Sequence, residues 1–197
     1  MKWLTRRGVV AALAVGVATA WGMGWRGMLV LLAFFISGSL LTRAAEAGGG
    51  PRNERQVLAN GGVAAIAAVL GSWPAFAGSI AAATADTWAT EIGRYSRVPP
   101  RLITTGAIVP PGTDGGITPL GTAGGIAGAG VIAALAFSLA PPNRIAAAMA
   151  GVFGMVLDSW LGATIQGTRA WLDNDAVNLA ATISGALVSV ALSRFCC

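Results

Sequence analysis

The chain alternates between long apolar segments and short polar connections. Most of the apolar segments are close to the roughly 17 residues that a helix needs to cross a bilayer. This pattern predicts an all-α, polytopic membrane bundle of about seven transmembrane helices, or six if one segment is re-entrant. The apolar segments cover approximately residues 8–25, 27–42, 56–72, 74–93, 119–140, 145–166 and 177–194.

Composition agrees with this interpretation and narrows the chemistry. Of the 197 residues, 55% are hydrophobic and 11% are charged, which is typical of a single integral membrane domain over residues 1–197. We expect it in a bacterial inner membrane or an equivalent membrane. The chain has no histidine, so carboxylates, hydroxyls, amides and arginines must supply any reactive groups. Any bound metal is then expected to be a hard, oxygen-liganded cation.

The basic residues predict an orientation, because Lys and Arg concentrate in cytoplasmic connections. With the N-terminus inside, ten of the thirteen basic residues lie in inner segments, and the C-terminus lies outside. The inner ones are Lys2, Arg6, Arg7, Arg43, Arg52, Arg55, Arg94, Arg97, Arg101 and Arg169, and the outer ones are Arg26, Arg144 and Arg194. No basic stripe is interleaved with aromatic residues, so nucleic acid is not an expected partner.

Two carboxylates, Asp86 and Glu91, lie inside the apolar segment 74–93, and Asp158 lies inside another. An ionisable group in hydrocarbon costs several kcal/mol unless it faces protein or water, so such groups usually serve a function. The predicted orientation puts all three in the cytoplasmic half of the membrane, together with Asn60 and Asn178. We therefore expect one active site at the cytoplasmic leaflet. The alternative is that the acids only form structural hydrogen bonds.

Helical periodicity turns the acids toward the inside of the bundle. Asp86 and Glu91 are about 140° apart on a regular helix, so they are expected to have separate tasks rather than to chelate one ion together. Small and polar residues share a face with Asp86 and with Asp158, and they allow close helix approach. These residues are Ser79, Ala83, Thr90 and Gly93 for Asp86, and Gly151, Gly154, Gly162 and Gln166 for Asp158.

A polar loop rich in glycine and proline, residues 94–118, follows the first two acids. Glycines allow the positive φ angles that aim successive N–H groups at one point, and a helix N-terminus follows. Arginines add charge and forked donors, so the loop is a candidate for binding phosphate, although an ordinary loop would look similar. The candidate phosphate-binding residues are Arg101, Thr104, Thr105, Gly112, Thr113, Asp114, Gly115, Gly116, Gly121 and Thr122.

Further polar residues follow the segment that carries Asp158. Asp173 and Asp175 are either solvated loop residues or members of the site. Asn178 lies just inside the last apolar segment and is expected to order the loop or a ligand. The remaining candidates for the polar site are Asn60, Ser159, Thr164, Asn174 and Asn178.

The order and spacing of these motifs resemble a known membrane family. The motifs are Ala85–Gly93, Pro100–Thr105, Pro111–Gly116, Gly121–Thr122, Asp158–Ser159 and Asn174–Asn178. Over residues 55–190 the chain is similar to the family that contains plant phytyl-phosphate kinase and transmembrane protein 19. The family core then covers residues 55–194, and residues 1–54 form two N-terminal helices and a cytoplasmic loop.

That family is distantly similar to the CTP-dependent polyprenol kinases and the phosphatidate cytidylyltransferases. Their pattern is an Asp at a helix end, a Lys/Thr-Gly loop and an Asp-x-x-Ser motif around a nucleotide and Mg²⁺. Asp86, the loop 104–116 and Asp158 are the counterparts here. The loop has no lysine, so Arg101 or a neighbouring arginine would have to supply that charge.

The resemblance implies a Mg²⁺-dependent phosphotransferase of isoprenoid lipid metabolism, such as tocopherol or quinone biosynthesis. It would transfer a phosphoryl group from a nucleoside triphosphate, CTP favoured, to phytyl or another polyprenyl monophosphate. The implied catalytic and metal-binding residues are Asp86, Glu91 and Asp158. Cytidylyl transfer and polyprenol kinase activity on a lipid are alternatives, as are an ion or solute transporter and a non-catalytic scaffold. The sequence leaves the oligomeric state open, a homo-oligomer included.

Overall fold

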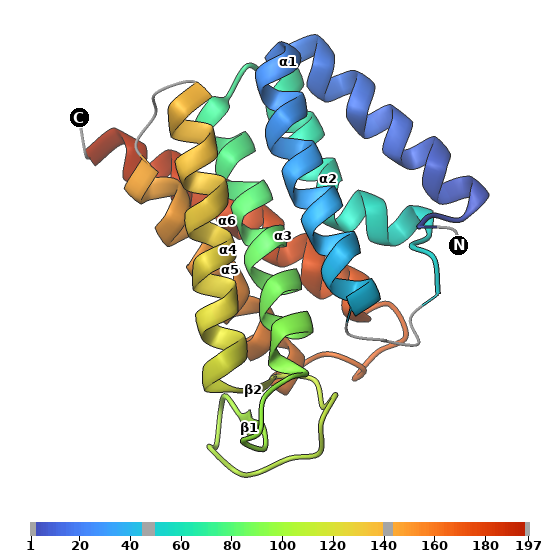
Figure 1. Ribbon diagram of the computed structural model, residues 1–197, viewed down its shortest axis with the longest axis vertical. Coiled ribbons are helices and arrows are strands. Elements are labelled where there is room, and N and C mark those ends of the chain that lie inside the picture. Colours follow the sequence, from blue (N-terminus) through green and yellow to red (C-terminus); the bar gives the residue numbers. More distant parts are fainter. Residues whose placement is uncertain (1–2, 45–49, 140–143, 196–197) are drawn as a thin grey trace.

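The computed structural model describes residues 3–44, 50–139 and 144–195, and it is a bundle of helices with one small hairpin (Figure 1). Within these residues there are six helices and two short strands. They are α1 (Arg6–Ala44), α2 (Glu54–Val69), α3 (Trp73–Gly93), β1 (Arg101–Leu102), β2 (Gly116–Ile117), α4 (Pro119–Leu139), α5 (Arg144–Thr164) and α6 (Asn174–Phe195).

Over the described ranges there are six helices rather than seven because the first two predicted segments, 8–25 and 27–42, run on from each other as the two arms of α1. Helix α1 has 39 residues and a kink at Gly24, where φ is 60° and ψ is −155°. A positive φ is readily adopted by glycine, so the chain turns sharply at this position. The two arms of α1, residues 6–23 and 25–44, diverge from the kink in Figure 1.

Four helices in the described part of the chain are long and apolar enough to cross a membrane. They are α1, α4, residues Ile145–Thr164 of α5, and α6. Helix α2 has 16 residues, which is just short of a bilayer crossing. Helix α3 is long enough but carries two carboxylates and several hydroxyls, and protein surrounds it on every side. The chain is thus an all-α membrane protein apart from the hairpin.

Helix α3 is the centre of the bundle and contacts every other helix. Residues 76–85 of α3 are all buried, and most of them are alanine, glycine or serine. In lipid, where apolar surface gains little from leaving the solvent, close backbone approach between small residues is what holds helices together. The composition of α3 therefore explains its central place.

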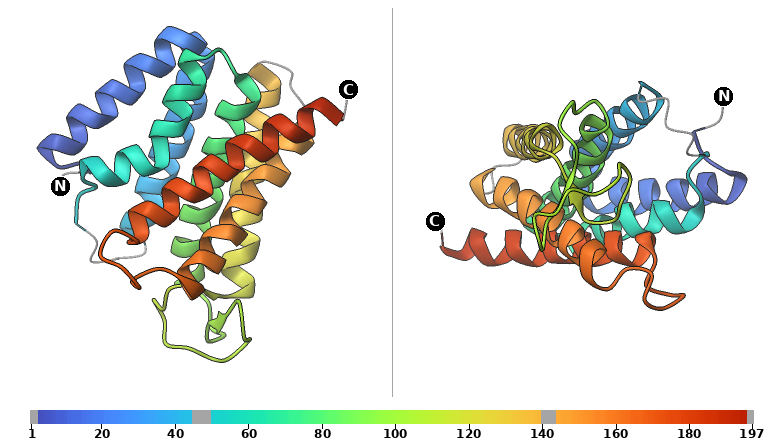
Figure 2. Two further views of the ribbon diagram at one scale, coloured as in Figure 1. Left: turned by 180° about the vertical axis from the view of Figure 1, so that it is seen from behind. Right: turned by 90° about the horizontal axis from the view of Figure 1, so that it is seen from below.

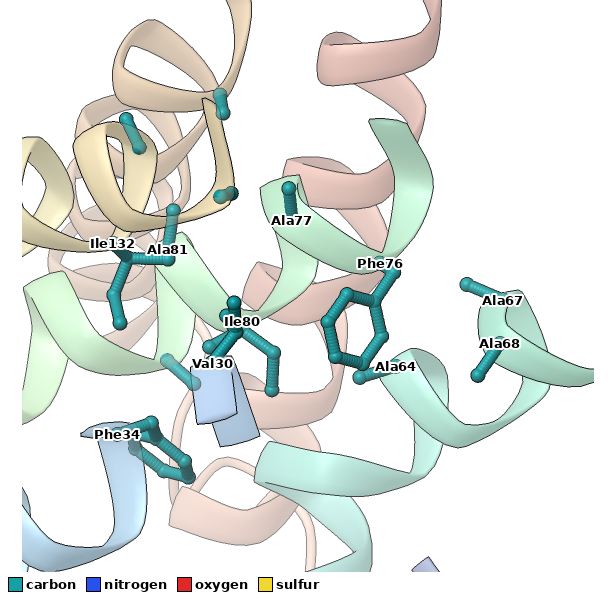
Figure 3. Close-up of a cluster of buried hydrophobic side chains, with 14 residues drawn as sticks. Val30, Phe34, Ala64, Ala67, Ala68, Phe76, Ala77, Ile80, Ala81 and Ile132 are labelled. Atoms are coloured by element: carbon teal, nitrogen blue, oxygen red, sulfur yellow. The ribbon is translucent and has the colours of Figure 1, made fainter. Parts of the chain in front are cut away.

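The crossing of α3 and α6 shows how close this approach is. A Cβ atom built on Gly185 of α6 would lie 2.6 Å from the carbonyl oxygen of Gly78 and 2.7 Å from Cβ of Ala82. Larger side chains form a cluster in the N-terminal half of α3 (Figure 3). This cluster contains Val30 and Phe34 of α1, Phe76 and Ile80 of α3, and Ile132 of α4.

The polar connections gather at one end of the bundle (Figures 1 and 2). The first described residues are held there, since Thr5 N–H donates to Arg52 O and Arg52 N–H donates to Trp3 O, both at 3.0 Å. Asn53 caps α2, accepting from Gln56 N–H at 3.0 Å while the Gln56 side chain accepts from Asn53 N–H. Lys2, one of the basic residues assigned to this end, lies outside the described residues.

The loop 94–118 is more ordered than the sequence predicts. Strands β1 and β2 pair antiparallel, with Arg101 opposite Ile117 and Leu102 opposite Gly116. Gly112 and Gly115 have φ angles of 86° and 72°, which confirms that glycines in this loop adopt positive φ. The hairpin closes the lower end of α3 and α4 in Figure 1.

We predict that Gly185→Ala lowers the free energy of unfolding by about 1–3 kcal/mol, because the new methyl group would overlap the backbone of α3. Thermal unfolding in detergent, followed by tryptophan fluorescence, would measure the loss. The matched control is Gly130→Ala in α4, since a Cβ atom at Gly130 meets no heavy atom within 4 Å. An equal loss in both variants would contradict the close α3–α6 crossing.

Candidate functional site

A cavity of about 660 Å³ lies at the end of the bundle that carries the polar connections. Its walls come from the last turns of α3, the loop 94–118, the first turn of α4 and the second half of α5. Most of the predicted site residues line it. These are Asp86, Gly112, Thr113, Asp114, Gly115, Gly116, Gly121, Thr122, Asp158, Ser159 and Asn174.

Asp86 and Asp158 face each other from α3 and α5 across this cavity. The two carboxyl groups lie within hydrogen-bonding reach of each other, and Asp114 from the loop is close enough to act on Asp158 electrostatically. Oδ2 of Asp158 is buried and has no hydrogen-bond partner in the protein. Two acids brought together in this way need a proton or a cation between them.

The close contact between helices explains how two acids in different apolar segments meet. A Cβ atom on Gly154 of α5 would lie 2.5 Å from Cβ of Ala82, and one on Gly151 would lie 2.9 Å from Cβ of Ala81. Asp158 follows Gly154 by one helical turn, as Asp86 follows Ala82. The small residues therefore set the distance at which the carboxyl groups face each other.

The donor set fits Mg²⁺, which is usually bound by one or two carboxylates with water or phosphate oxygens completing the shell. Asp86 and Asp158 supply two carboxylates, and one of their oxygens lacks a partner in the protein. The described residues contain no group of three or more Asp, Glu, His or Cys side chains arranged around one metal. Further ligands for a cation here would have to be water or a bound phosphate.

The wall opposite the acids is suited to an anion. The N-terminus of α4 opens on the cavity through Thr118, Gly121 and Thr122, and its dipole favours negative charge. Thr118 caps this helix by accepting from Gly121 N–H at 3.0 Å. Arg94 and Arg97 also line the cavity and bring positive charge. The site therefore places carboxylates and anion-binding groups around one space.

Three predicted phosphate-binding residues, Arg101, Thr104 and Thr105, do not line the cavity. The Arg101 guanidinium instead donates to the carbonyl oxygen of Gly106 at 2.8 Å, which ties down the hairpin. Thr105 Oγ1 accepts from Ala107 N–H at 3.3 Å, also within the loop. The arginines that line the cavity are Arg94 and Arg97 instead.

Other residues that line the cavity were outside the predicted set. They are Thr90, Gly93, Arg94, Arg97, Gly162 and Gln166, among others. A signal for several of them was present in the spacing. Positions 86, 90, 93 and 97 follow helical periodicity, as do 158, 162 and 166. The helix faces that carry Asp86 and Asp158 therefore include these positions up to the following loops.

Glu91 does not line the cavity, although the sequence placed it in one site with Asp86 and Asp158. Its carboxylate accepts from Thr42 Oγ1 of α1 at 2.8 Å and pairs with Arg94 Nε at 3.2 Å. Arg52, in the connection before α2, is close to Glu91, and burial lowers the pKa of its guanidinium while the charge of Glu91 opposes that shift. Glu91 therefore joins α3 to α1, and its predicted catalytic and metal-binding role stays a prediction.

A second polar cluster joins the start of α2 to the α5–α6 connection. Arg55 pairs with Asp173 at 2.6 Å and with Asp175 at 3.6 Å. The pKa of Asp173 is held below its ordinary value, mainly by a hydrogen bond from Ala176 N–H at 3.1 Å. The hydrogen bond and charge of Arg55 lower it further. These two acids have structural partners outside the cavity.

The other predicted polar residues, Asn60, Thr164 and Asn178, do not line the cavity. Asn60 donates from Nδ2 to Gln56 O at 3.0 Å, and Thr164 donates to Trp160 O at 2.8 Å. Asn178 is buried near the start of α6. Their part in ligand binding stays a prediction.

The fold and the cavity define a polytopic α-helical membrane protein with paired acids and a glycine-rich loop at one end. The chain belongs to the integral membrane protein DUF92 family, whose model matches residues 1–186. This confirms the family predicted from the sequence motifs. No solved structure matches the chain.

Relatives occur in archaea, cyanobacteria and plants. The uncharacterized membrane protein MJ0933 of Methanocaldococcus jannaschii is 35% identical, over 96% of this chain and 85% of its own. The uncharacterized membrane protein sll0875 of Synechocystis is 31% identical, over 97% of this chain and 83% of its own. Protein VTE6, chloroplastic, of Arabidopsis thaliana is 26% identical, over 98% of this chain and 66% of its own.

We predict that Glu91→Ala lowers the free energy of unfolding by about 2–4 kcal/mol, because it removes the hydrogen bond from Thr42, the ion pair with Arg94 and the negative charge that acts on the buried Arg52. The control is Glu54→Ala, which removes an exposed ion pair to Arg7 at 3.5 Å and should cost at most about 1 kcal/mol. Thermal unfolding of both variants in one detergent makes the comparison. Equal stability of the two variants would mean that Glu91 does not tie α3 to α1.

Proposed function

We propose that the protein is a Mg²⁺-dependent membrane kinase that converts an isoprenoid monophosphate to the diphosphate, with CTP as the favoured donor. The observation that carries the proposal is the pair Asp86 and Asp158, which face each other in a cavity also lined by the glycine-rich loop and the α4 N-terminus. The resemblance to the family of plant phytyl-phosphate kinase supports the choice of a prenyl monophosphate.

The phosphoryl donor would lie with its phosphates between the two walls of the cavity. Thr113, the glycine N–H groups of the loop and the start of α4 would bind the phosphate oxygens, and Arg94 and Arg97 would neutralise them. Asp86 and Asp158 would hold Mg²⁺, which neutralises charge on the transferred phosphoryl group. The side chains would therefore act by positioning the phosphates and the Mg²⁺ and by neutralising their charge.

In the reaction, an oxygen of the acceptor monophosphate attacks the γ-phosphorus of the nucleotide. A new P–O bond forms to the lipid phosphate, and the bond between the γ-phosphorus and the β,γ-bridging oxygen breaks. The products are the lipid diphosphate and a nucleoside diphosphate. The acceptor oxygen is already anionic, so the step needs no general base, in keeping with a chain that has no histidine.

The decisive experiment incubates purified protein with Mg²⁺, a nucleoside triphosphate and phytyl phosphate, using label at the α- or the γ-phosphate. Transfer of the γ-label to the lipid with release of nucleoside diphosphate is expected. Transfer of the α-label with release of pyrophosphate would make the protein a cytidylyltransferase instead. No labelled lipid with any nucleotide or prenyl phosphate would remove both enzyme proposals.

Asp86→Asn and Asp158→Asn are each expected to lower the rate of transfer by at least about 100-fold, because each removes one charged oxygen ligand. Initial rates at saturating Mg²⁺ and nucleotide would measure the loss. The control is Glu54→Gln, which changes a carboxylate that does not line the cavity and should leave the rate within about threefold. Full activity in both Asn variants would contradict the assignment of the acid pair.

We also propose that the cavity faces the cytoplasm, where nucleotides are available. The hairpin lies at one end of the bundle, and α6 runs away from that end (Figures 1 and 2). Alkaline phosphatase, which is active only outside the cytoplasm, is expected to be active when fused after Cys197 and inactive when fused within residues 103–108. The reverse result would place the cavity outside.

A further inference from the structure

One wall of the cavity is apolar and lies within the bundle rather than in the loops. Met155 and Val156 of α5 line the cavity at this wall, and Thr122 of α4 lies across from them. Val156 is also 44% exposed on the outside of the protein. A residue that borders both the cavity and the outer surface marks a place where the two are close.

The outer surface next to Val156 is a face for lipid. Large apolar side chains are exposed along α5 at positions spaced by three or four residues, which puts them on one side of the helix. These residues are Ile145, Met149, Phe153, Val156 and Trp160, and α4 adds Ile126. In a membrane protein such a face contacts hydrocarbon chains.

Helices α4 and α5 are closely packed at the level of Gly125 and Gly151, on the side of the cavity away from the loop 94–118. A Cβ atom on Gly125 would overlap the sulfur of Met155, and one on Gly151 would lie 2.8 Å from Cβ of Ala129. Below this contact Gly121 packs against α3, where an added Cβ would lie 2.6 Å from Ala89 O. Thr122 and Val156 both line the cavity, so the cavity reaches between α4 and α5 just below the contact of Gly125 with Met155.

The acid pair and this separation lie on opposite sides of the same cavity. Asp158 and Val156 are about 160° apart around α5, at the two edges of the face that lines the cavity, and only about 3 Å apart along the helix axis. A phosphate held near the acids is thus level with the lateral separation. A chain attached to that phosphate could reach lipid without crossing the loop.

We propose that the hydrocarbon chain of the acceptor monophosphate leaves the cavity between Thr122 and Val156 and lies along the outer face of α4 and α5. This inference rests on the proposed function, because it takes the acceptor to be a membrane lipid with a phosphate head. Keeping the chain in an apolar environment is worth about 0.8 kcal/mol for each CH₂ group, so a long chain would not be drawn into the polar cavity. The protein binds the head and leaves the tail in the bilayer.

The test narrows this exit with Val156→Trp and compares two acceptors, phytyl phosphate and the short, water-soluble dimethylallyl phosphate. The variant is expected to raise KM for phytyl phosphate by about tenfold or more and to change KM for dimethylallyl phosphate by less than about threefold. Val156→Phe, a smaller change, should give an intermediate effect on the long acceptor. It also provides a second measurement if the Trp variant does not fold.

The control is Val17→Trp in the first arm of α1, an exposed apolar position outside the cavity lining and away from the outer face of α4 and α5, and it should alter neither KM. Equal effects of Val156→Trp on both acceptors would overturn the exit, because they would locate the change at the phosphate head. An unchanged KM for phytyl phosphate in both Val156 variants would also overturn the proposed exit. If the wild-type protein uses neither acceptor, the proposed function fails first, and this inference falls with it.

Discussion

The close approach of helix backbones around α3 is the constraint on which the rest of the structure depends. Ten consecutive positions of this helix, 76–85, are buried, and small side chains let α5 and α6 approach it at Gly151, Gly154 and Gly185. A membrane bundle cannot rely on the hydrophobic effect to bring its helices together, so contact between small residues takes that place. Larger residues at these positions would push the helices apart.

The same approach makes the charged site tolerable inside a membrane protein. Asp86 and Asp158 lie just beyond the small-residue contact, where α3 and α5 are still close but the cavity begins. Their charge faces the cavity and its basic and amide groups rather than lipid, which is the arrangement that lowers the cost of an intramembrane acid. Glu91, on another face of α3, finds Thr42 and Arg94 instead.

The sequence predicted the site well where helical periodicity and the free-energy cost of a charge in the membrane determine where a side chain points. It predicted the site less well where loop geometry determines this. The small faces of α3 and α5 predicted that Asp86 and Asp158 would turn inward, and they meet. Arg101 was chosen for the phosphate because it lies within a motif, but a hairpin turns its guanidinium to Gly106. The break near Gly24 was already marked by the gap between the predicted segments 8–25 and 27–42, whereas the two short strands depend on pairing across the loop, which no apolar pattern encodes.

The way the glycine-rich loop rests on α5 has an energetic consequence for any ligand. Gly115 packs so tightly that an added Cβ would lie 2.5 Å from Cβ of Ala163, and Gly115 O accepts from Ile103 N–H at 3.0 Å. Fixing the backbone of a residue costs about 1–2 kcal/mol of conformational entropy. This loop is already ordered in the folded protein. A phosphate bound as proposed would meet a loop whose backbone is already fixed against α5. It would therefore cause less loss of conformational entropy, and bind more tightly, than it would at a flexible loop.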